Sequence, residues 1–351
     1  MVKNTALIYV SHPTGRIEPD VHFRYVDGEI NLENVPLNGS VLLKALYLSS
    51  EPLIRYRMRE AHVPLFCPPI ELGDPVDNFG IGKVVRSEDP NFSAGDYVYG
   101  YLEFSEYSVY PGRIAHAYKG PLTKVNKLPN VPLSIYLGAL GMPGTTAFQG
   151  IKGLAAEKLE TAKTMFVSGA AGPVGTFVIE YAKVLAPHIK VIASAGNTEK
   201  IRILKDVGTD VAFNYKEQDT AAILKEHGLI DIYWDHVAGS TLDAALKNFA
   251  DGGLIISCGA ISQASGDDSN TVHHFDEIFK RSLTVKGILC YRGESASVVP
   301  EFFNEAVPLV ISGKVSSHEH RYFGLEAAAK SLAGVHLGDN VGKAVIVVAE
   351  E

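Results

Sequence analysis

The 351-residue sequence contains only three cysteines, Cys67, Cys258 and Cys290. They are too few and too far apart for a disulfide framework, and no two of them have the spacing of zinc ligands. Sparse cysteine of this kind is typical of a reducing compartment. We therefore expect a cytoplasmic protein that holds no metal.

The sequence also lacks an excess of positive charge. Lysine and arginine total 32 against 40 aspartates and glutamates, which gives a net charge of −8. Because a phosphate backbone is bound by clustered cations, no nucleic-acid partner is expected. Residues 131–151 carry no charge, but two prolines and four glycines interrupt them, so no membrane partner is expected either.

What is present is an ordinary globular composition, 46% apolar and 21% charged, with enough length for two domains. Up to about Lys127, short runs rich in branched residues lie at 5–10, 40–48 and 83–85, separated by turn signals such as VDGE at 26–29. Strands at this spacing, with no long helical pattern between them, predict a barrel-like β domain.

From Lys163 onward, apolar runs alternate with helical patterns. We predict strands at 164–168, 190–194, 211–213, 230–234 and 254–257, and helices at 174–185, at 198–207 with Thr198 as N-cap, and from about Ser240. This alternation predicts an α/β domain of the Rossmann type, a doubly wound parallel sheet with helices on both faces.

The last apolar run, residues 343–348, has no strand pattern near it in the sequence. We therefore expect the C-terminus to return to the N-terminal β domain. The predicted organisation is a discontinuous β-rich domain of residues 1–130 with 310–351, and an α/β domain of residues 131–309.

A glycine-rich turn, GAAGPVG at residues 169–175, joins the first predicted strand of the βα series to its helix. Glycine lets the backbone approach a pyrophosphate, and the helix N-terminus offers free N–H groups and a positive dipole. A tight βα turn without a ligand is the alternative. The position of the turn at the start of the series favours a dinucleotide site.

The strand predicted at 190–194 ends without an acidic residue, whereas NAD-preferring sites place one there to bind the ribose 2′-hydroxyl. Lys200 follows within about one helical turn, and a cation near that hydroxyl suits the 2′-phosphate of NADPH. Two alternatives stay open: Lys200 could cover a solvated helix face, and Glu199 could point at the ribose.

Separate short motifs occur in order along almost the whole chain. They are LSSEPLIR at 48–55, EYSV at 106–109, GMPGTTAF at 141–148, the glycine-rich turn, AGNTEK at 195–200, AFNYK at 212–216, CGAIS at 258–262 and GDNVGK at 338–343. With these motifs the chain resembles the zinc-free medium-chain dehydrogenases/reductases. Within them it is most similar to the leukotriene B4 12-hydroxydehydrogenase/prostaglandin reductase group and the plant alkenal double-bond reductases.

This resemblance implies NADPH bound between a GroES-like β-rich domain and a Rossmann domain. It also implies reduction of the C=C bond of α,β-unsaturated aldehydes or ketones, with hydride added to the β-carbon and a proton to the α-carbon. A homodimer is expected, because the family is usually dimeric.

The resemblance further implies the cofactor-binding residues. Lys200 and Tyr215 would hold the 2′-phosphate, Met142, Pro143 and Thr145 would lie along the nicotinamide, and backbone at Ile288 and Cys290 would meet the carboxamide. The remaining predicted contacts are Ala171, Gly172, Pro173, Val174 and Gly175 of the turn, with Gly196, Cys258, Ile261 and Asn340.

The substrate side departs from the family pattern. Ala264 and Leu53 stand where the pattern has tyrosines that hold the substrate oxygen or relay the proton, and His236 stands where it has an asparagine. The proton donor is therefore open. Tyr56 is our first candidate and His236 our second, with a packed, hydrogen-bonded His236 and the ribose 2′-hydroxyl of the cofactor as alternatives.

Arg55, Tyr56 and Tyr291 are the predicted substrate contacts. The run RYRMR at 55–59 is locally basic, and its alternative interpretation is a solvated loop. A zinc alcohol dehydrogenase is not expected, because no Gly-His-Glu triplet exists and the adjacent His273 and His274 would point apart. A quinone reductase and a non-catalytic NADPH-binding homologue remain as alternative functions.

Overall fold

The computed structural model describes residues 1–110, 122–263 and 271–351. The chain divides into two compact units, one of Met1–Leu137 with Glu319–Glu351 and one of Gly138–His318. The sequence places these boundaries at 130 and 310. The first unit extends to Leu137 because the buried turn η1 (Leu133–Leu137) packs on strands of that unit. Its second segment begins at Glu319, where a strand starts.

Unit 1 is rich in β-structure. Its strands are β1 (Val2–Lys3), β2 (Ala6–Tyr9), β3 (Phe23–Val26), β4 (Glu29–Ile30), β5 (Val41–Ser49), β6 (Asp77–Ser87), β7 (Tyr97–Glu103), β8 (Tyr107–Tyr110), β9 (Thr123–Lys124), β16 (Glu319–Phe323) and β17 (Lys343–Val347). Its helices are α1 (Pro19–His22), α2 (Leu53–Arg57) and α11 (Ala328–Leu337), with the short η5 (Leu325–Ala327).

The largest sheet of unit 1 runs β16-β17-β5-β6-β7-β9, with β8 also paired to β5. The expected return of the C-terminus is confirmed, because β17 pairs antiparallel with β5, Ile346 opposite Leu48. One detail of that prediction is wrong: β17 also has a partner close in sequence, the parallel strand β16. The residues of β16 read EHRYF, and all of them are half-buried or exposed, so the strand has no strong apolar pattern.

The core of unit 1 lies between this sheet and α11. It is built from buried side chains of both segments of the chain, including Leu43, Leu48, Leu102, Leu332 and Ile346. Residues about 300 positions apart therefore share one core, which makes the discontinuous unit a single folding body.

Unit 2 alternates strands and helices. Its strands are β10 (Thr164–Val167), β11 (Lys190–Ala195), β12 (Val211–Asn214), β13 (Ile230–Asp235), β14 (Phe249–Ser257) and β15 (Thr284–Gly287). Its helical elements are α3 (Met142–Gly150), η2 (Ile151–Ala155), α4 (Ala156–Thr161), α5 (Pro173–Leu185), α6 (Thr198–Asp206), α7 (Thr220–His227), α8 (Gly239–Leu246), η3 (Ile261–Gln263), α9 (Glu277–Lys280), η4 (Glu294–Glu301) and α10 (Phe302–Ile311).

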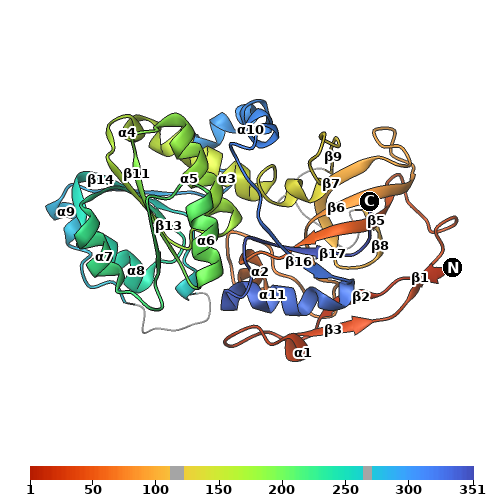
Figure 1. Ribbon diagram of the computed structural model, residues 1–351. Helices are drawn as coiled ribbons and strands as arrows, with labels where there is room; N and C mark the ends of the chain where they lie inside the picture. Colours follow the sequence, from red (N-terminus) through yellow and green to blue (C-terminus); the bar gives the residue numbers. More distant parts are fainter. Residues whose placement is uncertain (111–121, 264–270) are drawn as a thin grey trace. The chain divides into compact units, whose positions relative to one another are not determined.

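The strands of unit 2 pair in the order β12-β11-β10-β13-β14-β15, and every pairing is parallel. This is the 3-2-1-4-5-6 order of the Rossmann fold, so the predicted fold class is confirmed. Figure 1 shows α5 and α6 on one side of the sheet and α7 and α8 on the other. On the latter side the core contains Phe166, Leu224, Tyr233, Leu246 and Phe249.

Among the residues that the structure describes, none of the helices combines the length and the apolar character that a bilayer crossing requires. The uncharged stretch at 131–151 instead forms η1, α3 and the start of η2, and most of its side chains are buried.

Candidate functional site

The glycine-rich turn lies between β10 and α5, as the sequence predicts. Gly169 has a φ of 56°, a left-handed conformation that glycine adopts at little cost. The next residue ties the turn to the neighbouring strand, since Ala170 N–H donates to the Ser194 carbonyl at 3.0 Å. The helix α5 then begins at Pro173, with Gly172 as its N-cap.

Two glycines of this turn have different surroundings. A Cβ on Gly175 would lie 2.3 Å from the Ala170 carbonyl oxygen, so the helix approaches the turn too closely for any side chain. A Cβ on Gly172 would meet nothing nearer than the Gly169 carbonyl oxygen at 3.8 Å, and no side chain of the described residues caps α5. The open N-terminus of a 13-residue helix therefore fits an anionic pyrophosphate.

The carboxyl ends of β11 and β12 bring the predicted 2′-phosphate residues together, because Ala195 pairs with Asn214. Tyr215 N–H donates to the Ala195 carbonyl at 3.2 Å, and the Tyr215 side chain is 48% exposed. A Cβ on Gly196 would lie 3.1 Å from the Tyr215 hydroxyl and 3.2 Å from Cε of Lys216. Lys216 is thus a second cation at this place, and the sequence prediction missed it.

The N-cap of α6 is Asn197 and not Thr198 as predicted. Asn197 Oδ1 accepts from the Lys200 N–H at 2.9 Å, which fixes the first turn of the helix. Lys200 is half-buried in that first turn. Its position beside the ends of β11 and β12 fits the recognition of a phosphate monoester.

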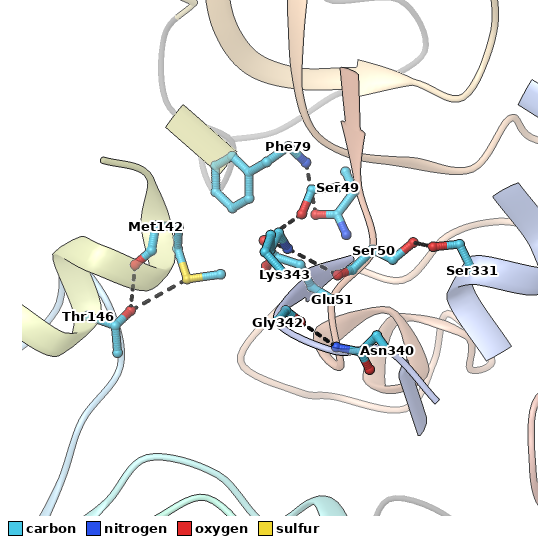
Figure 2. A network of polar contacts seen from close by, with 11 residues as sticks. Ser49, Ser50, Glu51, Phe79, Met142, Thr146, Ser331, Asn340, Gly342 and Lys343 are labelled. Carbon is cyan, nitrogen blue, oxygen red and sulfur yellow. Dashed lines mark hydrogen bonds and ion pairs between the residues drawn. The ribbon is translucent and has the colours of Figure 1, made fainter. Parts of the chain in front are cut away.

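The helix α3 carries Met142, Pro143 and Thr145 at its N-terminus. The Thr145 hydroxyl donates to the Gly141 carbonyl at 3.0 Å. The Thr146 hydroxyl donates to the Met142 carbonyl at 2.8 Å (Figure 2). Both hydroxyls thus give their protons to the helix backbone. Only the hydroxyl lone pairs remain for other partners.

The other predicted residues of unit 2 follow β14 and β15. Cys258 N–H donates to the Asp235 carbonyl at 2.9 Å, and Ile261 N–H donates to the His236 carbonyl at 3.2 Å. Ile288 N–H continues the sheet pairing by donating to the Ser257 carbonyl at 3.0 Å. Beyond it, Cys290 Sγ lies 3.8 Å from the Met142 carbonyl oxygen, and Tyr291 is 53% exposed.

His236 does not have the surroundings of a proton donor to substrate. The Trp234 indole N–H donates to His236 Nε2 at 3.0 Å, so Nδ1 carries the ring proton and donates to the Ser168 carbonyl at 2.7 Å. Burial lowers the pKa of His236, although the Ser168 carbonyl acts in the opposite direction. Both nitrogens are engaged and burial favours the neutral ring, so the geometry favours the alternative interpretation of His236 as a packed, hydrogen-bonded histidine.

The neighbouring thiol is also inert. Burial raises the pKa of Cys258 to about 12, which keeps the sulfur protonated. A protonated, buried cysteine is a poor nucleophile and a poor metal ligand. Cys258 therefore has a packing role in this part of unit 2 and not a chemical one.

In unit 1 the basic run at 55–59 is not a solvated loop. The Arg55 guanidinium donates to the Pro13 and Gly15 carbonyls, at 3.2 and 3.1 Å. Arg57 is buried, donates to the Asp77 carbonyl at 2.8 Å and forms an ion pair with the Asp77 carboxylate. Arg59 donates to the carbonyls of Tyr56, Val63 and Cys67. These arginines bind main-chain carbonyls, so their side chains hold the surrounding main chain in place.

Tyr56 lies in α2 and packs against Phe66, with ring centroids 5.9 Å apart. Burial raises the pKa of Tyr56, so its hydroxyl keeps its proton at physiological pH. Leu53 begins the same helix with no polar group. Ala264, the other position that departs from the family pattern, lies outside the described residues.

Asn340 belongs to unit 1. Its amide nitrogen donates to the Gly342 carbonyl at 2.6 Å, and its Oδ1 can still accept a hydrogen bond (Figure 2). Three residues after Asn340, Lys343 forms a buried ion pair with Glu51, Nζ to Oε1 3.2 Å, and also donates to the Ser50 carbonyl at 3.0 Å. The sequence prediction missed this pair, because nothing in either local sequence identifies the partner.

Within the described ranges, no group of three or more His, Cys, Asp or Glu side chains is placed to hold a metal ion. His273 and His274 do share a partner. Their backbone N–H groups both donate to the Asp243 carboxylate, and the His274 ring lies 2.8 Å from it. The pair therefore anchors a loop to α8.

Two family models match this chain. One is described as "Zinc-binding dehydrogenase" and matches residues 173–310, and the other is described as "N-terminal domain of oxidoreductase" and matches residues 6–117. The first match lies in unit 2 and the second in unit 1.

Curated relatives match along nearly the whole chain. A 2-alkenal reductase (NADP(+)-dependent) of Nicotiana tabacum is 36% identical over 360 residues, which is 100% of this chain and 99% of the relative. The (+)-pulegone reductase of Mentha piperita is 36% identical over 319 residues, 90% of this chain and 89% of the relative. The solved structure of CurA from Vibrio vulnificus in complex with NADPH has a TM-score of 0.85 at 26% identity, covering 99% of this chain and 100% of that one.

The Rossmann sheet order, the glycine turn and the β-rich unit completed by the C-terminal strand define a dehydrogenase/reductase of two units. With these matches, the chain belongs to the zinc-free medium-chain dehydrogenase/reductase family, in the group that contains the alkenal double-bond reductases.

Proposed function

We propose that the protein uses NADPH to reduce the C=C bond of α,β-unsaturated aldehydes or ketones. The observation that carries the proposal lies at the ends of β11 and β12, where the Tyr215 hydroxyl and Lys216 lie beside Gly196 and Lys200 stands in the first turn of the following helix. Two relatives that match most of the chain are named as a 2-alkenal reductase and a pulegone reductase, which supports the choice of reaction.

When bound, NADPH supplies the hydride, and the protein supplies binding and orientation. The open turn at Gly172 accepts the pyrophosphate, and Lys200 with Tyr215 binds the 2′-phosphate. The backbone at Ile288 and Cys290 and the N-terminus of α3 hold the nicotinamide, and Asn340 stays a predicted cofactor contact. A protonated hydroxyl such as that of Tyr56 stabilises negative charge that develops on the carbonyl oxygen of the substrate.

The 2′-phosphate assignment is tested by Lys200→Ala. Loss of a charged hydrogen bond typically costs about 1.5–3 kcal/mol, so the KM for NADPH should rise roughly ten- to a hundredfold. The KM for NADH should change little. The exposed Lys205 in the last turn of α6 is the matched control, and Lys205→Ala should leave both values unchanged. Equal losses with both cofactors would show that Lys200 does not contact the 2′-phosphate.

The pyrophosphate assignment is tested by two alanine substitutions in the turn. Gly172 has a φ of −81° and open space, so Gly172→Ala should keep the melting temperature and weaken NADPH binding by about tenfold, roughly 1.4 kcal/mol. Gly175→Ala should instead lower the melting temperature, because its methyl group meets the Ala170 backbone. Unchanged NADPH affinity in Gly172→Ala would place the pyrophosphate elsewhere.

The substrate class is tested by offering 2-alkenals, enones and quinones in turn and following the oxidation of NADPH. Reduction of the alkenals and enones, with the saturated carbonyl compound as product, supports the proposal. Turnover of quinones alone would make the protein a quinone reductase. Tight NADPH binding with no turnover of any class would make it a non-catalytic homologue.

The role of Tyr56 is tested with Tyr56→Phe, which removes the hydroxyl and keeps the ring against Phe66. If Tyr56 is the donor, kcat should fall by roughly tenfold to a thousandfold, since a preorganised donor is worth about 2.7–4 kcal/mol, and the KM for NADPH should not change. A wild-type kcat would leave the ribose hydroxyl or water as the donor.

We further propose a homodimer and a cytoplasmic location. The strand β15 ends the described sheet of unit 2 and is exposed along its length, and the side chains of Phe275 and Phe279 nearby are 68% and 75% exposed. An unpaired strand edge with exposed aromatic residues favours pairing with a second copy. Light scattering should give twice the monomer mass, and Val285→Pro in β15 should give the monomer mass.

A further inference from the structure

Gln149 has a fully buried side chain that makes polar contacts with one irregular segment of unit 2. It lies near the C-terminal end of α3. Its amide nitrogen lies 3.0 Å from the Arg292 carbonyl oxygen, 2.9 Å from the Ser295 hydroxyl and 3.4 Å from the Leu289 carbonyl oxygen. Its amide oxygen accepts from the Tyr291 N–H at 2.9 Å.

These partners fix the orientation of the amide. Carbonyl oxygens can only accept and a backbone N–H can only donate, so the nitrogen faces Leu289 and Arg292 while the oxygen faces Tyr291. One side chain thus satisfies both kinds of main-chain group in the segment 289–295. Such buried amide groups are costly when they are left without partners.

The segment needs this support because its backbone is unusual. Tyr291 has a φ of 64°, a left-handed conformation that is uncommon for a large side chain and persists where surrounding contacts enforce it. The N–H that Gln149 accepts belongs to this same residue. Gln149 is therefore placed to hold the strained turn in a single conformation.

The same helix contacts the segment at its other end. Cys290 Sγ lies 3.8 Å from the carbonyl oxygen of Met142, the first residue of α3. The helix that carries the nicotinamide-side residues Met142, Pro143 and Thr145 thus also supports the segment that includes Ile288 and Cys290. Both parts of the nicotinamide site are tied to one rigid element.

We propose that Gln149 is a positioning residue for the nicotinamide half of NADPH: through the Tyr291 N–H and the Leu289 and Arg292 carbonyls, it fixes the main chain that presents Ile288 and Cys290 to the carboxamide. This inference rests on the proposed function, which assigns the carboxamide to that backbone. Gln149 touches no reacting atom in this arrangement. Its effect is transmitted by the segment that it holds.

The test compares binding of NADPH with binding of 2′-phospho-ADP-ribose, which lacks the nicotinamide. Gln149→Met replaces the amide by an apolar chain of similar length. By calorimetry it should weaken NADPH binding about tenfold, which corresponds to roughly 1.4 kcal/mol, and leave the affinity for 2′-phospho-ADP-ribose within about twofold of wild type. The Tyr291 amide should also exchange its hydrogen faster in Gln149→Met.

Two further variants keep the test decisive. Gln149→Glu retains the size and the acceptor for Tyr291 and loses the amide donors, so it should show the same selective loss if Gln149→Met does not fold. Asn248→Leu removes another buried amide of unit 2, whose Nδ2 donates to the Ala244 carbonyl of the preceding helix at 2.8 Å. It should lower stability and leave the affinity ratio of the two ligands unchanged.

Equal weakening of both ligands in the Gln149 variants, or no weakening of either, would overturn the proposal. A wild-type protein that binds neither ligand would instead contradict the proposed function. The two failures are therefore distinguishable in the same set of titrations.

Discussion

Replacing Lys343 by methionine should strongly destabilise unit 1. Figure 2 shows the ion pair of Lys343 and Glu51. Both side chains are 3% exposed, so solvent screens neither charge. In Lys343→Met the Glu51 carboxylate keeps the Ser49 hydroxyl on Oε1 at 2.8 Å and loses its ion-pair partner. Oε2 already has no hydrogen-bond partner among the described residues, so the variant would bury a charge with a single donor.

The expected loss of stability in Lys343→Met follows from the distance between the two charges. Two unit charges 3.2 Å apart attract by roughly 5 kcal/mol at an effective dielectric constant of about 20. Removing one member of a buried pair typically costs about 3–5 kcal/mol, while replacing both by apolar residues is often neutral or stabilising. We therefore expect Lys343→Met to lose about 3–5 kcal/mol and the double variant Glu51→Leu/Lys343→Met to recover most of it.

The assay is native-state hydrogen exchange at the amides of β5 and β17, which reports the opening free energy of the strands that flank the pair. Fluorescence of Trp234, the single tryptophan of the chain, reports unit 2 and serves as the internal control. A loss below about 1 kcal/mol in Lys343→Met would refute the reasoning, because it would mean that water reaches the carboxylate. So would a double variant as unstable as the sum of the two single variants.

Three further predictions concern other groups. Burial raises the pKa of Glu180 to about 7, above its unfolded value of 4.5, so the folded state holds this proton more tightly. The free energy of unfolding should therefore fall by up to roughly 3 kcal/mol as pH rises from 4.5 to 7. Thermal melts across this range should show no such pH dependence in Glu180→Gln. Because both nitrogens of His236 are engaged, the pH profile of kcat/KM should show no ionisation that disappears in His236→Asn, whereas the melting temperature of that variant should fall. Arg59→Ala removes donors to three carbonyls and should make the 63–67 backbone more sensitive to limited proteolysis, while Lys44→Ala should not.

Much of the fold could be predicted because it depends on local patterns. The strands β10, β11 and β13 and the helix α5 have the apolar periodicity that their burial requires, and the glycine turn follows from backbone geometry. The return of β17 could be predicted because an apolar strand needs a sheet and no other strand pattern lay near it. The strand β16 was missed because its side chains are mostly polar and only partly buried.

The polar partnerships could not be predicted, since the choice of partner is made in three dimensions. Lys343 and Glu51 are 292 positions apart, and Gln149 is 140 to 146 positions from the groups that it binds. In the basic run at 55–59 the composition suggests solvent exposure, yet the arginines bind main-chain carbonyls, most of them in loops that have no periodicity of their own. A sequence pattern shows that a polar group is present and leaves its partner open.

The choice of proton donor also depends on partners that only the structure shows. From sequence, His236 and Tyr56 are both titratable groups in motifs of the substrate side, and nothing local separates them. In the structure the Trp234 indole and the Ser168 carbonyl occupy both nitrogens of His236, and burial keeps its ring neutral. Burial lowers the pKa of His236 but raises the pKa of Tyr56. A phenol with a raised pKa keeps the proton that a hydrogen-bond donor must have. One physical effect, the desolvation of a titratable group, therefore removes the imidazolium form of His236 and keeps the neutral form of Tyr56, which makes Tyr56 the side chain to test first.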